Sequence, residues 1–203
     1  LATHIQSQHW LVNELCAEQA ATLQSILPNA DIAIGDAETM DLEDEHSLII
    51  SANAVQWFDS PLSFVAQSAR RLQAGGQLLF NTFTPKNFWQ IKHLTGQGLY
   101  YPDINEWQLA LISAGFEIIE LSTQHFELPF ASPYAVLKHM KLTGVSTNRT
   151  QVNASNIQPF MWTKTRLQQF ESDYWQYFSA QDDAGQPIVH LTYEVLIVSA
   201  YKP

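Results

Sequence analysis

Short apolar runs alternate with stretches of helical spacing along most of this chain. Apolar runs rich in β-branched and aromatic residues predict strands, and apolar residues three or four positions apart predict helices. The expected strands are 10–13, 31–34, 47–52, 77–83, 116–121 and 190–201. The expected helices are the end of one at 1–8, then 16–27, 61–72, 104–114, 132–142 and 163–178. This alternation predicts an α/β fold, with a mostly parallel sheet that has helices on both faces.

Turn and capping residues define several of these boundaries. We expect Gly75 and Gly76 to end the helix at 61–72. Pro133 suits the first position of the helix at 132–142, and Thr163 suits the N-cap of the helix at 163–178.

The long segment 129–187 separates the last two expected strands. It contains two of the predicted helices and an Asn-, Ser- and Thr-rich stretch at 145–158, which predicts a loop. We expect this segment to be a helical lid over the carboxyl edge of the sheet. We expect the chain 1–203 to form one domain with no independent second domain.

Composition narrows the class of protein. The chain has 203 residues, of which 46% are apolar, enough for one domain with a sizeable core. No run approaches the roughly 20 apolar residues that span a bilayer, and no signal peptide opens the chain, so we expect no membrane partner. A single cysteine, Cys16, excludes an intrachain disulfide framework and suits the cytoplasm. No Cys/His cluster has zinc spacing, so we expect no metal.

Charge is unevenly distributed. The net charge of −10 argues against nucleic acid as a partner. Residues 1–60 carry ten acidic side chains and no Lys or Arg, whereas residues 128–170 carry no acid and five basic side chains: Lys138, Lys141, Arg149, Lys164 and Arg166. Such asymmetry is typical of a partner surface, but it also fits a chance run on a solvated face.

Polar residues follow three consecutive strands, where open α/β sheets bind their ligands. Glu14 ends the first strand, and its carboxylate could accept hydrogen bonds from ribose hydroxyls or could simply favour the start of the next helix. Asp36 follows Gly35 in a tight turn, where it could accept from an adenine amine or form an Asx turn. Residues 51–57 end the third strand, and there Trp57 also fits core or lid packing.

Several other chemistries lack their motif in this sequence. Ser51 has no G-x-S-x-G context, the seven histidines have no triad spacing, and no G-x-x-x-x-G-K phosphate loop is present. The glycine-rich loop that would hold a dinucleotide or nucleoside is also absent from this sequence.

Four features in order resemble class I methyltransferases: the acidic strand end, the turn at 35–37, the Ala-Val-Gln-Trp run at 54–57, and Arg-Arg-Leu-x-x-Gly-Gly at 70–76. Ser51–Trp57, Lys138–Gly144 and Leu191-Thr192-Tyr193 resemble one family in particular. That family is the malonyl-acyl-carrier-protein O-methyltransferases of biotin synthesis (the BioC family). The resemblance covers essentially the whole chain.

The resemblance implies a Rossmann-like methyltransferase sheet with an antiparallel C-terminal strand. It implies S-adenosylmethionine as the cofactor and the free carboxylate of a malonyl thioester on acyl carrier protein as the methyl acceptor. It also implies that the family's glycine-rich cofactor motif and first strand precede Leu1.

The resemblance also implies roles for individual residues. Carried over, Glu14 holds the ribose, Asp36 and Ala37 hold the adenine, Asn53 and Ala54 line the methionine side, and Gln56 and Trp57 lie near the transferring methyl. On the acceptor side, the pocket candidates are His139, Lys141 and Tyr193, and the cations that could orient the carboxylate are Lys138, His139, Lys141 and Arg166. The five basic residues of 128–170 would receive the acidic carrier protein.

Two alternatives stay open on the residues alone. One is a related methyltransferase that acts on another small carboxylate or hydroxyl. The other is a methyltransferase-like protein without transfer activity that serves as an assembly or binding factor.

Overall fold

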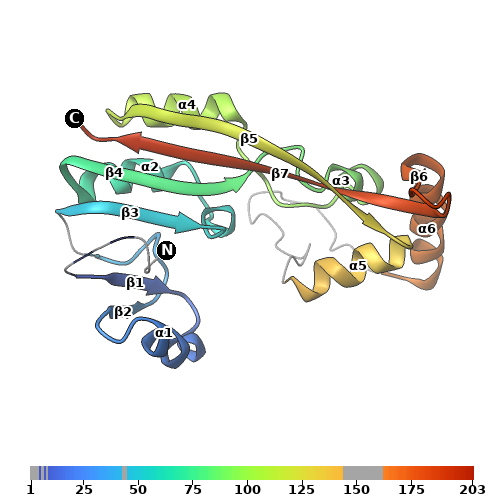
Figure 1. Cartoon of the computed structure of the whole chain (residues 1–203), viewed down its shortest axis with the longest axis horizontal. Helices are drawn as coiled ribbons and strands as arrows, with labels where there is room; N and C mark the ends of the chain where they lie inside the picture. The colour runs from blue at the N-terminus through green and yellow to red at the C-terminus, as the bar shows by residue number, and fades with distance from the viewer. Residues whose placement is uncertain (1–4, 6, 8, 43–44, 144–161) are drawn as a thin grey trace.

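A computed structural model of the chain describes residues 5, 7, 9–42, 45–143 and 162–203 (Figure 1). Its strands are β1 (Leu11–Glu14), β2 (Asp31–Ile34), β3 (His46–Ala52), β4 (Leu72–Phe83), β5 (Glu117–Phe130), β6 (Ser179–Gln181) and β7 (Pro187–Tyr201). Its helices are α1 (Ala20–Ile26), α2 (Ser63–Arg71), α3 (Trp89–Thr95), α4 (Ile104–Ser113), α5 (Pro133–Leu142) and α6 (Lys164–Phe178), with 3₁₀ turns η1 (Ala17–Gln19) and η2 (Val55–Trp57). The helix end expected at 1–8 falls largely outside the described residues, and the loop expected at 145–158 wholly so.

The strands form two groups. β1 pairs with β2 in parallel, and a second sheet has the order β3-β4-β7-β5, with β6 added to β7. β3 and β4 are parallel, whereas β7 runs antiparallel to β4, β5 and β6. The antiparallel C-terminal strand is therefore confirmed, and so is the mostly parallel direction of the other strands: β3, β4 and β5 run the same way, and β1 and β2 are parallel to each other. β7 is the exception, because it enters between two strands that both run opposite to it.

Gly75 and Gly76 do not end α2, contrary to expectation. The helix ends at Arg71, Leu72 is already extended, and both glycines lie inside β4. There the Gly75 N–H donates to the Lys202 carbonyl, and the Lys202 N–H donates to the Gly76 carbonyl. A Cβ on Gly76 would lie 2.9 Å from the Gln73 carbonyl oxygen. Gly76 is therefore explained by the close approach of the backbone at this end of the sheet and not by the end of a helix.

Two apolar clusters lie on opposite faces of β7. Alternate residues of a strand point to opposite faces, and β7 uses Leu196, Val198 and Ala200 on one face and Val189 and Leu191 on the other. The first face packs against α2 and α4 through side chains that include Val65, Trp107 and Leu111. The second packs against α3, α5 and α6 through side chains that include Ile91, Val136, Met140, Phe170 and Tyr174. Helices thus cover both faces, as the sequence predicts (Figure 1).

The two helices between β5 and β7 are confirmed together with their capping residues. Pro133 occupies the first turn of α5, where the Ser132 hydroxyl accepts a hydrogen bond from the Ala135 N–H. Thr163 is the N-cap of α6 and accepts from the Arg166 N–H. Within the described ranges, no helix is long and apolar enough to cross a membrane.

Three elements differ from the sequence prediction or are absent from it. β5 continues to Phe130, well past residue 121, because its second half pairs with β7 residue by residue as far as Val189. β6 adds a short strand to the same β7 segment. α3 was not predicted; it is a short helix whose two caps, Phe88 and Gly96, both have left-handed backbone conformations.

Candidate functional site

The polar strand ends predicted from the sequence come to one edge of the molecule. β1, β3 and β4 point in the same direction in Figure 1, toward the side where α5 lies, and β2 is parallel to β1. Glu14 ends β1 opposite Ile34 of β2, so Asp36 follows within two residues of that pair. Asn53 is the first residue after β3. Ligands of open α/β sheets bind at this edge.

The two candidate carboxylates each make one local hydrogen bond. Glu14 Oε1 accepts from the Cys16 N–H at 2.9 Å, and Asp36 Oδ1 accepts from the Glu38 N–H at 3.0 Å. These are the helix-start and Asx-turn contacts that the sequence left open as alternatives. Each bond uses one carboxylate oxygen, so each group keeps a second oxygen with which it can accept from a ligand.

The turn that carries Asp36 is held by neighbouring side chains. Asn13 Nδ2 donates to the carbonyls of Ala33 and Gly35. Gly35 has a positive φ of 153°, and a Cβ there would lie 2.6 Å from the Met40 sulfur, so a side chain at this position is excluded unless Met40 moves. The neighbouring Ala37 is half-buried.

Glu38 is a positioning residue that sequence reasoning missed. Its two carboxylate oxygens accept from the backbone N–H groups of Asp59 and Ser60, at 2.6 and 2.9 Å. The bonds join the loop after β2 to the loop after η2, although the residues lie more than 20 positions apart. The sequence signal nearest to this role is the Ser60-Pro61 pair, which predicts a turn but does not indicate that Glu38 binds it.

The end of β3 is shaped by two asparagines and a buried glutamine. Asn53, with a left-handed φ of 51°, exchanges two hydrogen bonds with Asn81 of β4. Gln56 Nε2 donates to the Asn53 carbonyl at 2.6 Å, while its Oε1 is buried and has no hydrogen-bond partner. Ala54 is exposed and Trp57 half-buried beside them. The structure therefore groups four of the predicted site residues around one turn.

On the acceptor side, the structure brings two of the predicted residues into direct contact. His139 Nε2 of α5 lies 2.7 Å from the Tyr193 hydroxyl of β7. The Tyr193 ring packs against Phe88 at 4.6 Å between centroids and lies 6.2 Å from Phe83. Burial raises the pKa of Tyr193, while the Thr143 hydroxyl partly opposes this by stabilising the phenolate. The phenol is therefore neutral near neutral pH.

The predicted basic residues do not join this contact. Lys138 and Lys141 are exposed on α5, and Lys164 and Arg166 are exposed at the start of α6. Arg149 lies outside the described residues. None of the ion pairs within the described ranges involves Lys138, Lys141 or Lys164.

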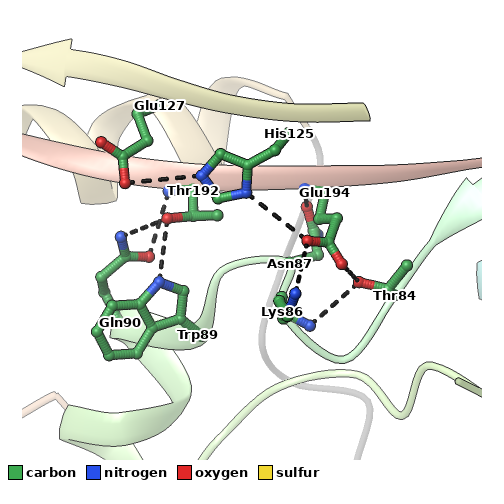
Figure 2. Close-up of polar contacts among 9 residues, drawn as sticks. All are labelled: Thr84, Lys86, Asn87, Trp89, Gln90, His125, Glu127, Thr192 and Glu194. Atoms are coloured by element: carbon green, nitrogen blue, oxygen red, sulfur yellow. Dashed lines mark hydrogen bonds and ion pairs between the residues drawn. The ribbon is translucent and has the colours of Figure 1, made fainter. Parts of the chain in front are cut away.

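A buried polar network that the sequence did not suggest lies beyond the end of β4 (Figure 2). Beyond Phe83, β4 no longer pairs with β7, and residues 84–90 lie beside β7 instead. The Phe88 N–H donates to the Thr192 carbonyl at 2.9 Å, and the Gln90 side chain bonds both the N–H and the hydroxyl of Thr192. Trp89 Nε1 donates to the same hydroxyl at 3.0 Å. The segment after β4 is thereby fixed to the C-terminal strand.

Glu194 is the charged centre of this network. Its side chain is only 8% exposed, and its Oε1 accepts from the Thr84 hydroxyl at 2.7 Å. Its Oε2 lies 3.4 Å from Lys86 Nζ and 3.7 Å from His125 Nδ1, and both of these partners are more than half exposed. A buried carboxylate needs such partners. No group of three or more His, Cys, Asp or Glu residues within the described ranges could hold a metal ion.

Comparisons with known proteins agree with this arrangement. A family model for a methyltransferase domain matches residues 7–80. A Haemophilus ducreyi protein named malonyl-[acyl-carrier protein] O-methyltransferase is 36% identical over 208 residues, which cover 100% of this chain and 75% of the relative. Proteins of the same name from Bacteroides helcogenes and Acinetobacter baylyi are 38% and 36% identical and cover 93% and 83% of this chain. The chain spans 65% and 62% of the length of these last two relatives.

Solved structures support the fold. A candidate methyltransferase from Bacillus halodurans has a TM-score of 0.65 at 21% identity and covers 97% of this chain and 84% of its own. An S-adenosylmethionine-dependent methyltransferase from Mesorhizobium loti has a TM-score of 0.53 at 13% identity, with coverage of 97% and 81%. At these identities the likeness establishes the Rossmann-like methyltransferase fold alone.

Proposed function

This chain belongs to the malonyl-[acyl-carrier protein] O-methyltransferase family, and on that basis we propose that the protein methylates the free carboxylate of a malonyl thioester on acyl carrier protein. The methyl donor is S-adenosylmethionine, and the reaction serves the synthesis of the biotin precursor. The observation that carries the proposal is that Glu14, Asp36 and Asn53 stand at or just after the carboxyl ends of β1, β2 and β3 in a chain of this family. The names of the relatives do not favour either alternative reading.

The residues at this edge fit the nucleoside end of the cofactor. Glu14 and Asp36 each keep a carboxylate oxygen for a ribose hydroxyl or an adenine amine. Ala37 and Ala54 offer small surfaces to the adenine and the sulfonium side, and Asn53 carries a polar side chain next to Ala54. The buried Oε1 of Gln56 is the kind of unsatisfied group that functional sites often contain. We assign Glu14 to the ribose, Asp36 and Ala37 to the adenine, and Asn53 and Ala54 to the methionine side.

The chemistry requires no proton transfer. When bound, S-adenosylmethionine supplies an electrophilic methyl group on a sulfonium. Glu14, Asp36 and Asn53 would hold this cofactor, and the methyl group would pass to an oxygen of the malonyl carboxylate with the electron pair of the carbon–sulfur bond left on the sulfur. A carboxyl group is ionised near neutral pH, so no general base is needed. The task of the protein is to hold the two groups in line and to exclude water.

The helices between β5 and β7 complete the proposed site. We propose that the segment 129–187 acts as a lid within a single domain, with Gln56, Trp57, His139, Lys141 and Tyr193 toward the acceptor. Lys138, Lys141, Arg149, Lys164 and Arg166 form the proposed docking surface for the acidic carrier protein, because complementary charge accelerates encounter. The single cysteine suits a cytoplasmic enzyme.

Methyl transfer measured with the full-length protein tests this function. Malonyl carrier protein and labelled S-adenosylmethionine should give a methyl ester on the malonyl group, detected by mass spectrometry of the released acyl thioester. Free malonate and acetyl carrier protein serve as controls and should accept little label. Equal transfer to free malonate would support a different small carboxylate as substrate. Cofactor binding without transfer to any of the three would support the binding-factor alternative.

A further inference from the structure

The Tyr193 hydroxyl can donate a hydrogen bond to a ligand while it contacts His139. A tyrosine hydroxyl has one O–H donor and two acceptor lone pairs. If His139 Nε2 carries its proton and donates to the Tyr193 oxygen over the 2.7 Å contact, the phenolic O–H is left to donate elsewhere. Because burial raises the pKa of Tyr193 above its usual value, the phenol keeps this proton near neutral pH, where a carboxylate acceptor is ionised. The contact can therefore present a neutral hydrogen-bond donor to an anion.

An apolar groove adjoins the same tyrosine. Phe126 and Leu128 of β5 and Tyr193 and Val195 of β7 line an open hollow of about 220 Å³. Phe126 stands directly opposite Tyr193 in the strand register, and period-two alternation places Leu128 and Val195 on the same face. Sites for drug-sized ligands are larger, about 300–1,000 Å³. The groove therefore suits a small apolar group, and the Tyr193 ring that lines it carries the hydroxyl that contacts His139.

The sheet face that carries Tyr193 also extends to the end of β3, where we place the cofactor. Phe83 follows Asn81 by two residues on β4, so both side chains point to one face, and Phe83 lies 6.2 Å from the Tyr193 ring. Asn81 in turn is bonded to Asn53. A group held at Tyr193 thus lies on a continuous face with the end of β3, where we place the methionine side of the cofactor.

Building on the proposed function, we infer that Tyr193, oriented by His139, donates a hydrogen bond to the acceptor carboxylate, and that the Phe126–Leu128–Val195 groove receives the apolar thioester arm. One neutral donor orients the carboxylate and leaves its charge available for attack on the methyl group. A short acyl thioester with a terminal carboxylate has both required parts. Lys138 and Lys141, which are exposed on α5, are then left for the carrier protein.

Direct binding tests the assignment without relying on turnover. The full-length protein, saturated with S-adenosylhomocysteine, is titrated calorimetrically with malonyl-pantetheine and with acetyl-pantetheine, which lacks the carboxylate. Tyr193→Phe should weaken malonyl-pantetheine binding by about tenfold to a hundredfold, the range expected for a hydrogen bond to a charged group. Its effect on acetyl-pantetheine should be less than about twofold. Tyr134→Phe is the matched control, because this exposed α5 tyrosine loses the same hydroxyl away from the groove.

Three further variants separate the orienting role of His139 from direct contact with the ligand. His139→Gln, which retains a side-chain N–H donor, should recover part of the malonyl affinity that His139→Ala loses. Leu128→Ser should weaken both thioesters to a similar extent. In steady-state kinetics, Tyr193→Phe should raise KM more than it lowers kcat, because the contact is present in both the ground and transition states.

Three results would overturn the assignment. The first is that Tyr193→Phe binds malonyl-pantetheine as the wild type does, and the second is that it loses both thioesters equally. The third is that the wild type binds malonyl-pantetheine no better than acetyl-pantetheine. Should Tyr193→Phe fold poorly, the comparison of His139→Gln with His139→Ala decides in the same way. Methyl transfer to malonyl carrier protein, measured separately, tells failure of this site apart from failure of the proposed function.

Discussion

The side-chain amide of Asn81 donates a hydrogen bond of 2.7 Å to Oδ1 of Asn53, and the Asn53 N–H donates back to Asn81 Oδ1 at 3.2 Å. This pair joins the adjacent carboxyl ends of β3 and β4, where Ala52 and Asn81 are register partners. It also holds Asn53 in a left-handed conformation that most residues avoid. A turn at the proposed cofactor edge is thus shaped by a contact between two strands.

The left-handed φ of Asn53 predicts an unusual order of stability among its variants. Asn53→Gly loses the side-chain bonds but adopts the conformation freely, whereas Asn53→Ala loses the same bonds and is strained. We expect the alanine variant to be less stable than the glycine variant by about 1 kcal/mol. Urea unfolding of both proteins measures this difference. An alanine variant as stable as the glycine variant would show that the backbone relaxes here.

The carboxylates of Glu14 and Asp36 should contribute to cofactor affinity. Glu14→Ala and Asp36→Ala should each weaken S-adenosylhomocysteine binding by about tenfold to a hundredfold, because each removes a charged hydrogen-bond acceptor. Calorimetry with the full-length protein measures the affinity. Glu18→Ala is the control, since Glu18 is an exposed acid in the next turn of the chain. Unchanged affinity in both variants would show that Glu14 and Asp36 make only their local hydrogen bonds and do not bind the cofactor.

The Thr84 hydroxyl should matter for stability because Glu194 is buried. Thr84→Val keeps the shape of the side chain but removes the 2.7 Å donor to Glu194 Oε1. We expect a loss of about 1–3 kcal/mol in the free energy of unfolding, the usual result of leaving a buried polar group unsatisfied. Lys86→Met removes an exposed partner of the same carboxylate and should cost at most about 1 kcal/mol. Equal losses in the two variants would contradict this ranking.

Tyr101 should make the protein less stable at high pH. Burial raises the pKa of Tyr101 from 10.0 to about 12, although the hydrogen bond with Asn87 partly lowers it. The folded state therefore keeps a proton that the unfolded chain loses. The contribution of Tyr101 to the free energy of unfolding is therefore complete below pH 10 and decreases as the pH rises toward 12. The decrease amounts to about 2 kcal/mol by pH 12.

Tyr101→Phe should remove this part of the pH dependence. The variant loses the Asn87 contact at every pH, so its stability is shifted by a constant amount. Urea unfolding of wild type and variant at intervals from pH 8 to pH 11.5 separates the two effects. Parallel pH profiles would show that Tyr101 ionises in the folded protein as readily as in the unfolded chain.

Charge reversal on the proposed docking surface should slow carrier binding selectively. We would change Lys138, Lys141, Arg149, Lys164 and Arg166 to Glu, one at a time. A docking residue should reduce the rate with malonyl carrier protein but not with malonyl-pantetheine, and the reduction should shrink in high salt. A variant that impairs both substrates equally marks a residue needed for folding or for the acceptor carboxylate. If all five variants leave the rate with malonyl carrier protein unchanged, these basic residues form a solvent-exposed surface that does not bind the carrier.

Local signals in the sequence were enough to place several elements. β2 has the predicted bounds, and α5 and α6 begin where their caps predict, because Ser132, Pro133 and Thr163 act within one helical turn of their own positions. As expected, Glu14 ends its strand and Asp36 follows the next one. Their ligand roles stay predictions, because a strand end shows where a side chain lies and not what it binds.

Long-range pairing decided the rest. The length of β5 and the position of Gly75 and Gly76 inside β4 depend on strands that come later in the chain. The contacts of His139 with Tyr193 and of Thr84 with Glu194 join residues 54 and 110 positions apart.

The amino-acid sequence by itself determined the alternation of elements, the capped helices and the edge of the sheet where polar residues gather, because hydrophobic periodicity and capping act over a few residues. Only the tertiary structure decided how far β5 extends along β7 and that Tyr193 faces His139 beside an apolar groove. Those features arise when β7 pairs between β4 and β5, and the free energy of that pairing comes from partners that no local window contains.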